Sequence, residues 1–141
     1  MRPPDEVRRD LVRQWLRKAE EDFAVAERLL SEKLPYLNAI GFHAQQSAEK
    51  FLKAVLVRHS VEFPKTHDID ELLDLIATFD VSLTESLRGT TALSAYGVDI
   101  RYPGDFPEMT PDDAKAAVAL ALEVRAAVNR VLTPRVGGAG A

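Results

Sequence analysis

The chain has 141 residues, of which 46% are hydrophobic, and this fits a single globular domain better than a disordered chain or two domains. It has no cysteine, which excludes a disulfide framework, a thiolate zinc site and a thiol nucleophile. A net charge of −4 argues against a general nucleic-acid coat. No apolar run approaches the roughly 18 residues that span a bilayer, and no secretory signal is present, so we expect a cytoplasmic protein without membrane contact.

The charges are distributed unevenly along the chain. Residues 34–67 hold four Lys or Arg against two acidic residues, and they also hold all three histidines. Residues 68–113 hold eleven acidic residues against two arginines. A local phosphate site within the first of these segments is therefore compatible with an acidic protein.

Two long helices are predicted at the start of the chain. Apolar residues recur every three or four positions from about residue 5 to 31, which is typical of one helix face: Val12, Trp15, Leu16, Ala19, Phe23, Ala26 and Leu30. Pro35 interrupts this pattern. A second helix is predicted over Tyr36–Arg58, with the apolar stripe Ile40, Ala44, Ala48, Phe51, Leu52 and Val55.

A loop over residues 63–67 precedes two further predicted helices. Asp68 is a good N-cap, and Glu71 stands three residues later, at the capping-box position. The short helix that follows is predicted to end near Phe79. A fourth helix is predicted over Leu83–Ile100, despite two glycines within it.

The last predicted helix begins after Thr110, an N-cap followed by proline, and runs to about Leu132. Its packing residues are predicted to be Val118, Leu122, Val124 and Val128. Residues 134–141 read as a flexible tail. The predicted fold is all-α: an up-and-down antiparallel bundle of four long helices and one short helix, forming a single domain over residues 5–133.

The second helix carries an unusual set of polar residues at the edges of its apolar stripe. On a helical wheel one edge holds His43, Ser47 and Lys50, the opposite edge holds Gln45 and Glu49, and Gln46 and Lys53 lie between them. The simplest interpretation is two surface pairs, Gln46–Lys50 and Glu49–Lys53. The alternative is that these edges contact a ligand or a partner.

Common catalytic and metal-binding patterns are missing from the sequence. His43, His59 and His67 have no metal-ligand spacing, and no Glu-x-x-His pair or phosphate-binding glycine loop is present. A triad of Ser47, His43 and Asp22 lacks the nucleophile-elbow context. We therefore predict no catalytic residue, no metal ligand and no cofactor.

Four segments occur in an order that resembles the HEPN domain family: Trp15 to Asp22, His43 to Ala54, Thr66 to Leu73, and Arg101-Tyr102-Pro103. The likeness covers roughly residues 10–132. It implies an up-and-down helical bundle that commonly forms homodimers and has links to nucleotides or RNA. The resemblance also implies a partner, because many members of the family are encoded beside a minimal nucleotidyltransferase and work with it as a toxin–antitoxin pair. We therefore expect such a protein as the partner.

One departure from the family pattern bears on activity. The ribonuclease members carry an arginine followed, after four to six residues, by a histidine, and this spacing occurs nowhere in the sequence. We therefore expect a non-catalytic binding module. Phosphate is expected to meet Lys50, Lys53, His67 and Arg101, with Tyr102 stacking on a base. The complete set of expected ligand or partner residues is His43, Gln46, Lys50, Lys53, His67, Asp68, Arg101 and Tyr102.

Two alternatives remain open from the sequence. One is a ribonuclease toxin with a non-standard site, in which His43 or His67 acts together with Arg101. The other is a purely structural role, in which the polar residues of the second helix form a dimer seam and bind no ligand.

Overall fold

The computed structural model describes residues 3–96 and 108–133, which are helical and contain no strand. This confirms the predicted all-α bundle. Three helices of the described residues are long and the others are short: α1 (Pro4–Ser31), α2 (Leu37–Arg58), α3 (Ile69–Ile76), α4 (Val81–Leu87), the 3-10 helix η1 (Arg88–Tyr96) and α5 (Pro111–Leu132).

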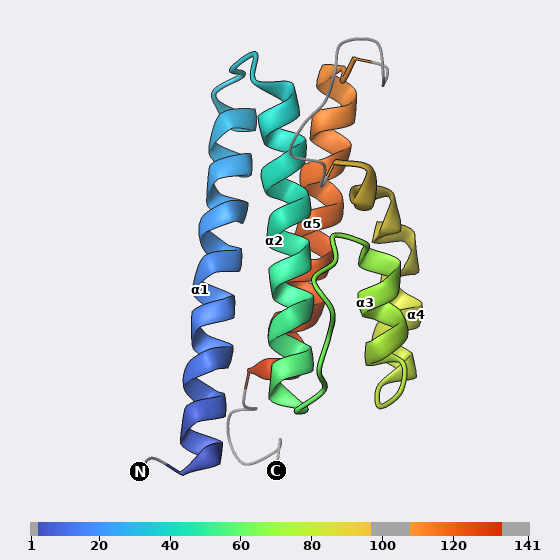
Figure 1. Cartoon of the computed structure of the whole chain (residues 1–141). Coiled ribbons are helices and arrows are strands. Elements are labelled where there is room, and N and C mark those ends of the chain that lie inside the picture. Colours follow the sequence, from blue (N-terminus) through green and yellow to red (C-terminus); the bar gives the residue numbers. More distant parts are fainter. Residues whose placement is uncertain (1–2, 97–107, 134–141) are drawn as a thin grey trace.

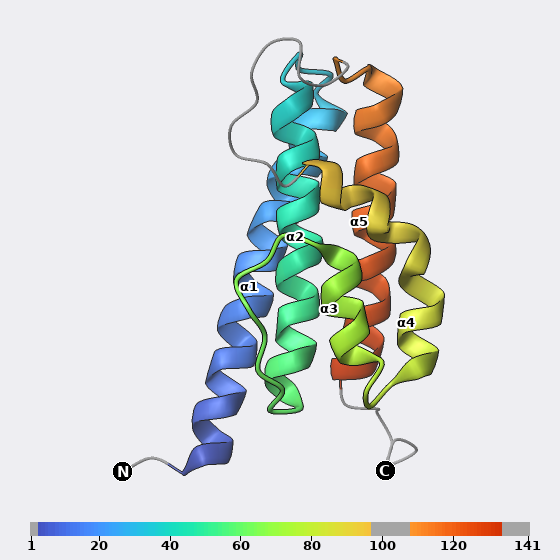
Figure 2. The same ribbon diagram turned by 45° about the vertical axis from the view of Figure 1, so that its right-hand side comes forward.

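Helix α2 occupies the centre of the bundle. It packs against α1, α5, α3 and η1, and its two neighbours α1 and α3 lie on opposite sides of it (Figures 1 and 2). The segment after α2 runs back along this helix before α3 begins (Figure 1). Because α2 is covered on several sides, most of its residues between Ile40 and Leu56 are buried, including polar ones.

The first two helices end in the same kind of turn. After α1, the N–H groups of Lys33 and Leu34 donate to the carbonyls of Leu30 and Leu29, and an equivalent pair of bonds follows α2 around Ser60. This is the Schellman arrangement, in which glycine is the usual residue in the left-handed conformation. Here Lys33 (φ 55°) and Ser60 (φ 57°) adopt it instead, at an energetic cost that glycine avoids.

Helix α5 begins as the sequence predicts. The Thr110 hydroxyl accepts a bond from the Asp113 N–H, and the Asp113 carboxylate accepts one from the Thr110 N–H. Pro111 takes the first helical position, where no N–H is needed. Of the four residues predicted to pack, Leu122 is the exception, because it lies on the exposed side.

The predicted helix over Leu83–Ile100 is wrong in its extent. Helix α4 spans only Val81–Leu87, and Arg88–Tyr96 form a 3-10 helix, while residues 97–107 lie outside the described part of the chain. The sequence Gly89-Thr90-Thr91 explains the change, since glycine and β-branched residues disfavour α-helix. Helix α3 also ends at Ile76, three residues before the predicted end.

Close approach to α2 depends on Gly41. A Cβ atom at this position would lie 2.9 Å from the Met109 sulfur and 3.3 Å from Cγ of Tyr96. The absence of a side chain therefore lets η1 and the segment before α5 pack directly on α2. This completes a core that joins all the helices: α1 contributes Phe23, α3 Leu72, α4 Leu87 and α5 Val124.

Candidate functional site

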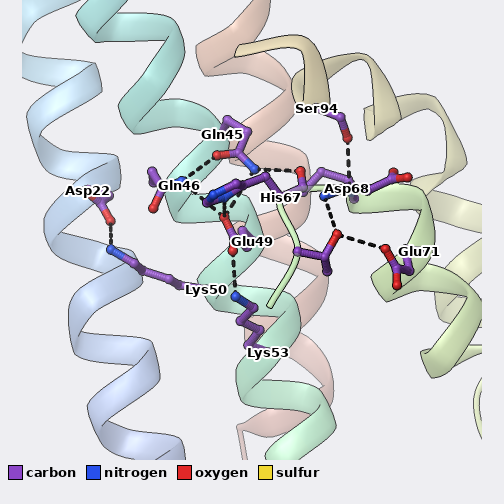
Figure 3. A network of polar contacts seen from close by, with 12 residues as sticks. Asp22, Gln45, Gln46, Glu49, Lys50, Lys53, His67, Asp68, Glu71 and Ser94 are labelled. Carbon is purple, nitrogen blue, oxygen red and sulfur yellow. Dashed lines mark hydrogen bonds and ion pairs between the residues drawn. The ribbon is translucent and has the colours of Figure 1, made fainter. Parts of the chain in front are cut away.

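A polar network on α2 gathers most of the predicted binding residues (Figure 3). Gln45, Ser47, Glu49 and Lys53 are all buried in this helix. Buried polar groups are unfavourable unless they are hydrogen-bonded, and no buried side-chain nitrogen or oxygen of the described residues lacks a partner. Two carboxylates, one from α1 and one from α2, organise the network.

The first carboxylate is Asp22 of α1, which contacts two residues of α2. Asp22 Oδ1 lies 2.9 Å from Nδ1 of His43, and Asp22 Oδ2 lies 2.5 Å from Nζ of Lys50. We call Asp22, His43 and Lys50 the Asp22 cluster. Its side chains are partly open to solvent, at 14%, 32% and 26% exposure respectively. Because an ionised carboxylate only accepts hydrogen bonds, the Nδ1 atom of His43 carries the proton, and this fixes the orientation of the ring.

The second carboxylate is Glu49, which accepts bonds from four side chains. Lys53 Nζ donates to Glu49 Oε1 at 2.6 Å. Glu49 Oε2 accepts from Gln45 Nε2 at 3.3 Å, Gln46 Nε2 at 3.1 Å and His67 Nδ1 at 3.1 Å. We call these five residues the Glu49 cluster. Its carboxylate is 5% exposed and the Lys53 side chain 11%, whereas the His67 side chain is 56% exposed.

Aromatic rings enclose the Lys53 ammonium group. Its nitrogen lies 5.5 Å from the ring centroids of both Trp15 and Phe63, and these two rings meet edge to face at 6.1 Å. A cation over a ring face is attracted by the ring quadrupole. Lys53 is therefore stabilised by a carboxylate and two rings, and the Glu49–Lys53 pair is buried, not the surface pair predicted from the sequence.

Hydrogen bonds to the segment before α3 place His67 beside Glu49. Gln45 Nε2 donates to the His67 carbonyl at 3.0 Å, and the Ile69 N–H donates to the Ser94 hydroxyl at 2.8 Å. The Thr66 hydroxyl accepts from the Asp68 N–H and donates to the Glu71 carboxylate. Figure 3 shows these bonds around the labelled side chains. The His67 backbone is thus tied to α2 and to the start of α3.

Asp68 caps α3 as predicted, since its carboxylate accepts from the Asp70 N–H at 3.0 Å. The predicted capping box is wrong. Glu71 receives the Thr66 hydroxyl at 2.8 Å and does not take the Asp68 N–H, which Thr66 already occupies. The Thr66 hydroxyl, two residues before the N-cap, thus accepts the Asp68 N–H bond that the Glu71 carboxylate would accept in a capping box. The capping-box sequence pattern takes no account of that residue.

The structure sorts the eight expected binding residues into groups. His43 and Lys50 meet at Asp22, while Gln46, Lys53 and His67 meet at Glu49. Asp68 serves as the cap of α3. Arg101 and Tyr102 lie outside the described residues. The predicted Gln46–Lys50 surface pair gives way to separate partners, Glu49 for Gln46 and Asp22 for Lys50.

Sequence reasoning left three organising residues out of the binding set, namely Asp22, Gln45 and Glu49. A signal for Glu49 was present, because it shares one edge of α2 with Gln45 and stands four residues before Lys53. In the sequence, Asp22 stands out only as the last residue of the first HEPN-like segment and as a member of the rejected triad with Ser47 and His43. Its contact with His43 depends on the packing of α1 on α2, which spacing within one helix does not show.

Two general features of the described residues also bear on the kind of site. In residues 3–96 and 108–133, no group of three His, Asp or Glu side chains is arranged to hold a metal ion. Among the helices of these same residues, none combines the length and apolar character that crossing a bilayer requires.

Comparison with known proteins identifies the family. The family model described as the HEPN domain matches residues 12–131, most of the chain. The chain belongs to the HEPN domain family. Its fold is similar to the crystal structure of TT1696 from Thermus thermophilus, with a TM-score of 0.69 and 32% sequence identity over 86% of this chain and 98% of that one. No curated protein matches the chain.

The HEPN match contains both polar clusters. The Asp22 cluster joins the first two helices of the HEPN domain, and the Glu49 cluster joins α2 to the start of α3. The clusters therefore lie within the family's shared bundle and not in an added segment.

Proposed function

We propose that this HEPN protein is a non-catalytic module that binds a nucleotide through the exposed edges of the Asp22 and Glu49 clusters. The observation that carries the proposal is a repeated arrangement. Each of His43 and His67 is held through Nδ1 by a carboxylate, and each carboxylate also holds a lysine. Figure 3 shows the Glu49 arrangement and the Asp22–Lys50 contact.

This arrangement suits the binding of phosphate. An imidazole anchored through Nδ1 directs its Nε2 atom away from the carboxylate, where it donates to a phosphate oxygen once it is protonated. Both imidazoles are accessible, at 32% and 56% side-chain exposure. Each lysine charge is balanced by its carboxylate, so the exposed imidazole edge is the part of each cluster that is left to contact a ligand.

The absence of the arginine–histidine spacing supports the non-catalytic part of the proposal. We extend the proposal to a homodimer that works with a minimal nucleotidyltransferase in a two-component, toxin–antitoxin-like system, as the HEPN family implies.

Calorimetric titration with ATP, GTP and AMP tests the nucleotide site. We expect saturable binding that weakens at least about tenfold in His43→Gln and His67→Gln, since a charge-assisted hydrogen bond is lost in each. His59→Gln is the matched control, because His59 stacks on Phe79 and belongs to neither cluster. A wild-type protein that binds none of these nucleotides contradicts the proposal.

Co-expression with the product of the adjacent reading frame tests the partner. If that frame encodes a small nucleotidyltransferase, we expect the two proteins to co-purify, and light scattering should show a dimer of this chain within the complex. Separate elution of the two proteins at micromolar concentration would exclude the two-component arrangement and leave the nucleotide site standing.

A ribonuclease is the second candidate, because a carboxylate-anchored histidine is also a common general acid or base. Asp22–His43 and Glu49–His67 both have this geometry. Such an activity predicts growth arrest when the protein is expressed, lost in His43→Ala, His67→Ala or Arg101→Ala. Harmless overexpression of the wild type rejects it. A purely structural seam predicts instead that Gln46→Ala changes oligomeric state without altering any ligand affinity.

A further inference from the structure

A cavity lies at the end of the bundle where α1 turns into α2 and α5 begins, an end that both views place together (Figures 1 and 2). Its volume is about 670 Å³, within the range of small-molecule sites. The walls are aliphatic, formed mainly by Leu30, Leu34, Leu37 and Ile40. None of the residues of the Asp22 or Glu49 clusters lines it.

The rim of this cavity is positively charged. Lys33 and Lys115 stand there with a single acid, Asp112. Neither lysine forms an ion pair within the described residues, and Glu32 beside Lys33 is already paired with Arg28 at 2.9 Å. In a chain of net charge −4, two unpaired lysines over an aliphatic cavity form a local site for one negative charge.

The backbone at Lys33 supports a role for its side chain. Lys33 holds a left-handed conformation (φ 55°) at the end of α1, where glycine is the least costly residue. A residue that keeps a strained conformation is a reasonable candidate for function. The retained side chain is also one that lines the cavity.

We infer that this cavity binds a small amphipathic anion, of the class of medium-chain carboxylates. The aliphatic walls would take the hydrocarbon chain, and Lys33 and Lys115 would take the carboxylate. A nucleotide fits less well, because the described residues of the lining include no Asn, Gln, Ser, Thr or aromatic side chain to bind a base or sugar. The site is separate from the proposed nucleotide site.

Calorimetric titration of the full chain with decanoate tests this inference, with decyltrimethylammonium as the probe of opposite charge. We expect saturable one-to-one binding of decanoate and none of the ammonium compound. Leu37→Trp, which fills the cavity, should abolish binding while circular dichroism shows an intact helical fold. Absence of saturable decanoate binding, or equal binding of both probes, overturns the inference.

Lys33→Gly gives the sharper test because two effects should move in opposite directions. Loss of the charge should weaken decanoate binding about fivefold to tenfold, while relief of the left-handed strain should raise Tm by about 2–5 °C. Ser60→Gly is the matched control: it relieves the same strain after α2 (φ 57°), so it should raise Tm and leave the affinity unchanged.

Two further outcomes decide against the site. If Lys33→Gly raises Tm but leaves decanoate affinity unchanged, Lys33 binds no ligand. If Lys33→Gly abolishes ATP binding instead, the cavity belongs to a nucleotide and not to an aliphatic anion. Decanoate binding that is unchanged in His43→Gln separates this inference from the proposed function, so either one can fail alone.

Discussion

The Asp22 cluster and the Glu49 cluster use the same chemistry at different depths. In both, one carboxylate bonds a lysine Nζ and a histidine Nδ1. The lysine of the first cluster is 26% exposed and that of the second is 11% exposed and enclosed by two rings. Since desolvation raises the cost of losing a partner, the Glu49 cluster should contribute more to the free energy of unfolding than the Asp22 cluster.

The largest expected effect is that of Glu49→Ala. It leaves the buried Lys53 ammonium group without a counter-charge and removes the acceptor of His67 and one of the two acceptors of each glutamine. We expect the free energy of unfolding to fall by about 3–5 kcal/mol in urea titrations. Glu123→Ala, an exposed acid on α5, is the control and should change it little. A fall in the free energy of unfolding of less than about 1 kcal/mol would contradict the burial of the Glu49–Lys53 pair.

Asp22→Ala should have a smaller effect on stability. Its two partners are partly solvated and retain water as an alternative partner, so we expect a loss of about 1–2 kcal/mol. Nucleotide affinity should fall at the same time, because His43 loses its orientation. Urea unfolding and calorimetry on the same variant measure both quantities. A stability loss equal to that of Glu49→Ala removes the distinction between the clusters.

Phe63→Leu tests the aromatic enclosure that distinguishes Lys53 from Lys50. Removing one of the two rings that lie 5.5 Å from Lys53 Nζ should lower the free energy of unfolding by about 0.5–1 kcal/mol. Phe42→Leu is the comparison, since the Phe42 ring meets His43 edge to face at 5.5 Å, and within residues 3–96 and 108–133 no lysine lies over it. If both variants are equally stable in urea, the rings contribute packing alone.

The smallest expected effect concerns His59, the histidine that belongs to neither cluster. Partial desolvation of the ring stacked on Phe79, with a contribution from Arg58 and against an opposing one from Asp80, lowers the pKa of His59 from its usual value of 6.5. His59 of the unfolded chain then binds its proton at a higher pH than His59 of the folded chain. The contribution of His59 to the free energy of unfolding is therefore complete above pH 6.5 and is lost as the pH falls below that value. His59→Phe keeps a ring against Phe79 and removes this slope.

The measurement is the urea midpoint at several values from about pH 5 to pH 7.5. His59→Phe should show a shallower decline on acidification than the wild type. A decline as steep as that of the wild type would show that His59 does not titrate in this range.

Much of the fold follows from local patterns in the sequence. Three- and four-residue spacing gave α1 and α2 almost to the residue, and Thr110-Pro111 marked the start of α5. The predicted extent of α4 is wrong because the weak helix formers Gly89-Thr90-Thr91 end the α-helix, which local spacing alone does not indicate.

The site was less accessible to such reasoning. The spacing of Glu49 and Lys53 is the same for a surface pair and a buried one, and depth is decided by Trp15 and Phe63 from other elements. Likewise, His43 meets Asp22 and His67 meets Glu49 across 21 and 18 residues of chain. Only tertiary packing supplies those contacts.

Nitrogen chemical shifts of the imidazole rings, followed by NMR during a nucleotide titration, show whether the two carboxylate-held imidazoles contact the nucleotide. The chain has only three histidines, so each ring can be assigned by substitution. We predict a proton on Nδ1 of His43 and His67, and a shift of both Nε2 signals as nucleotide is added, with His59 unchanged. Nε2 signals of His43 and His67 that stay fixed at saturating nucleotide would show that these imidazoles do not bind the nucleotide.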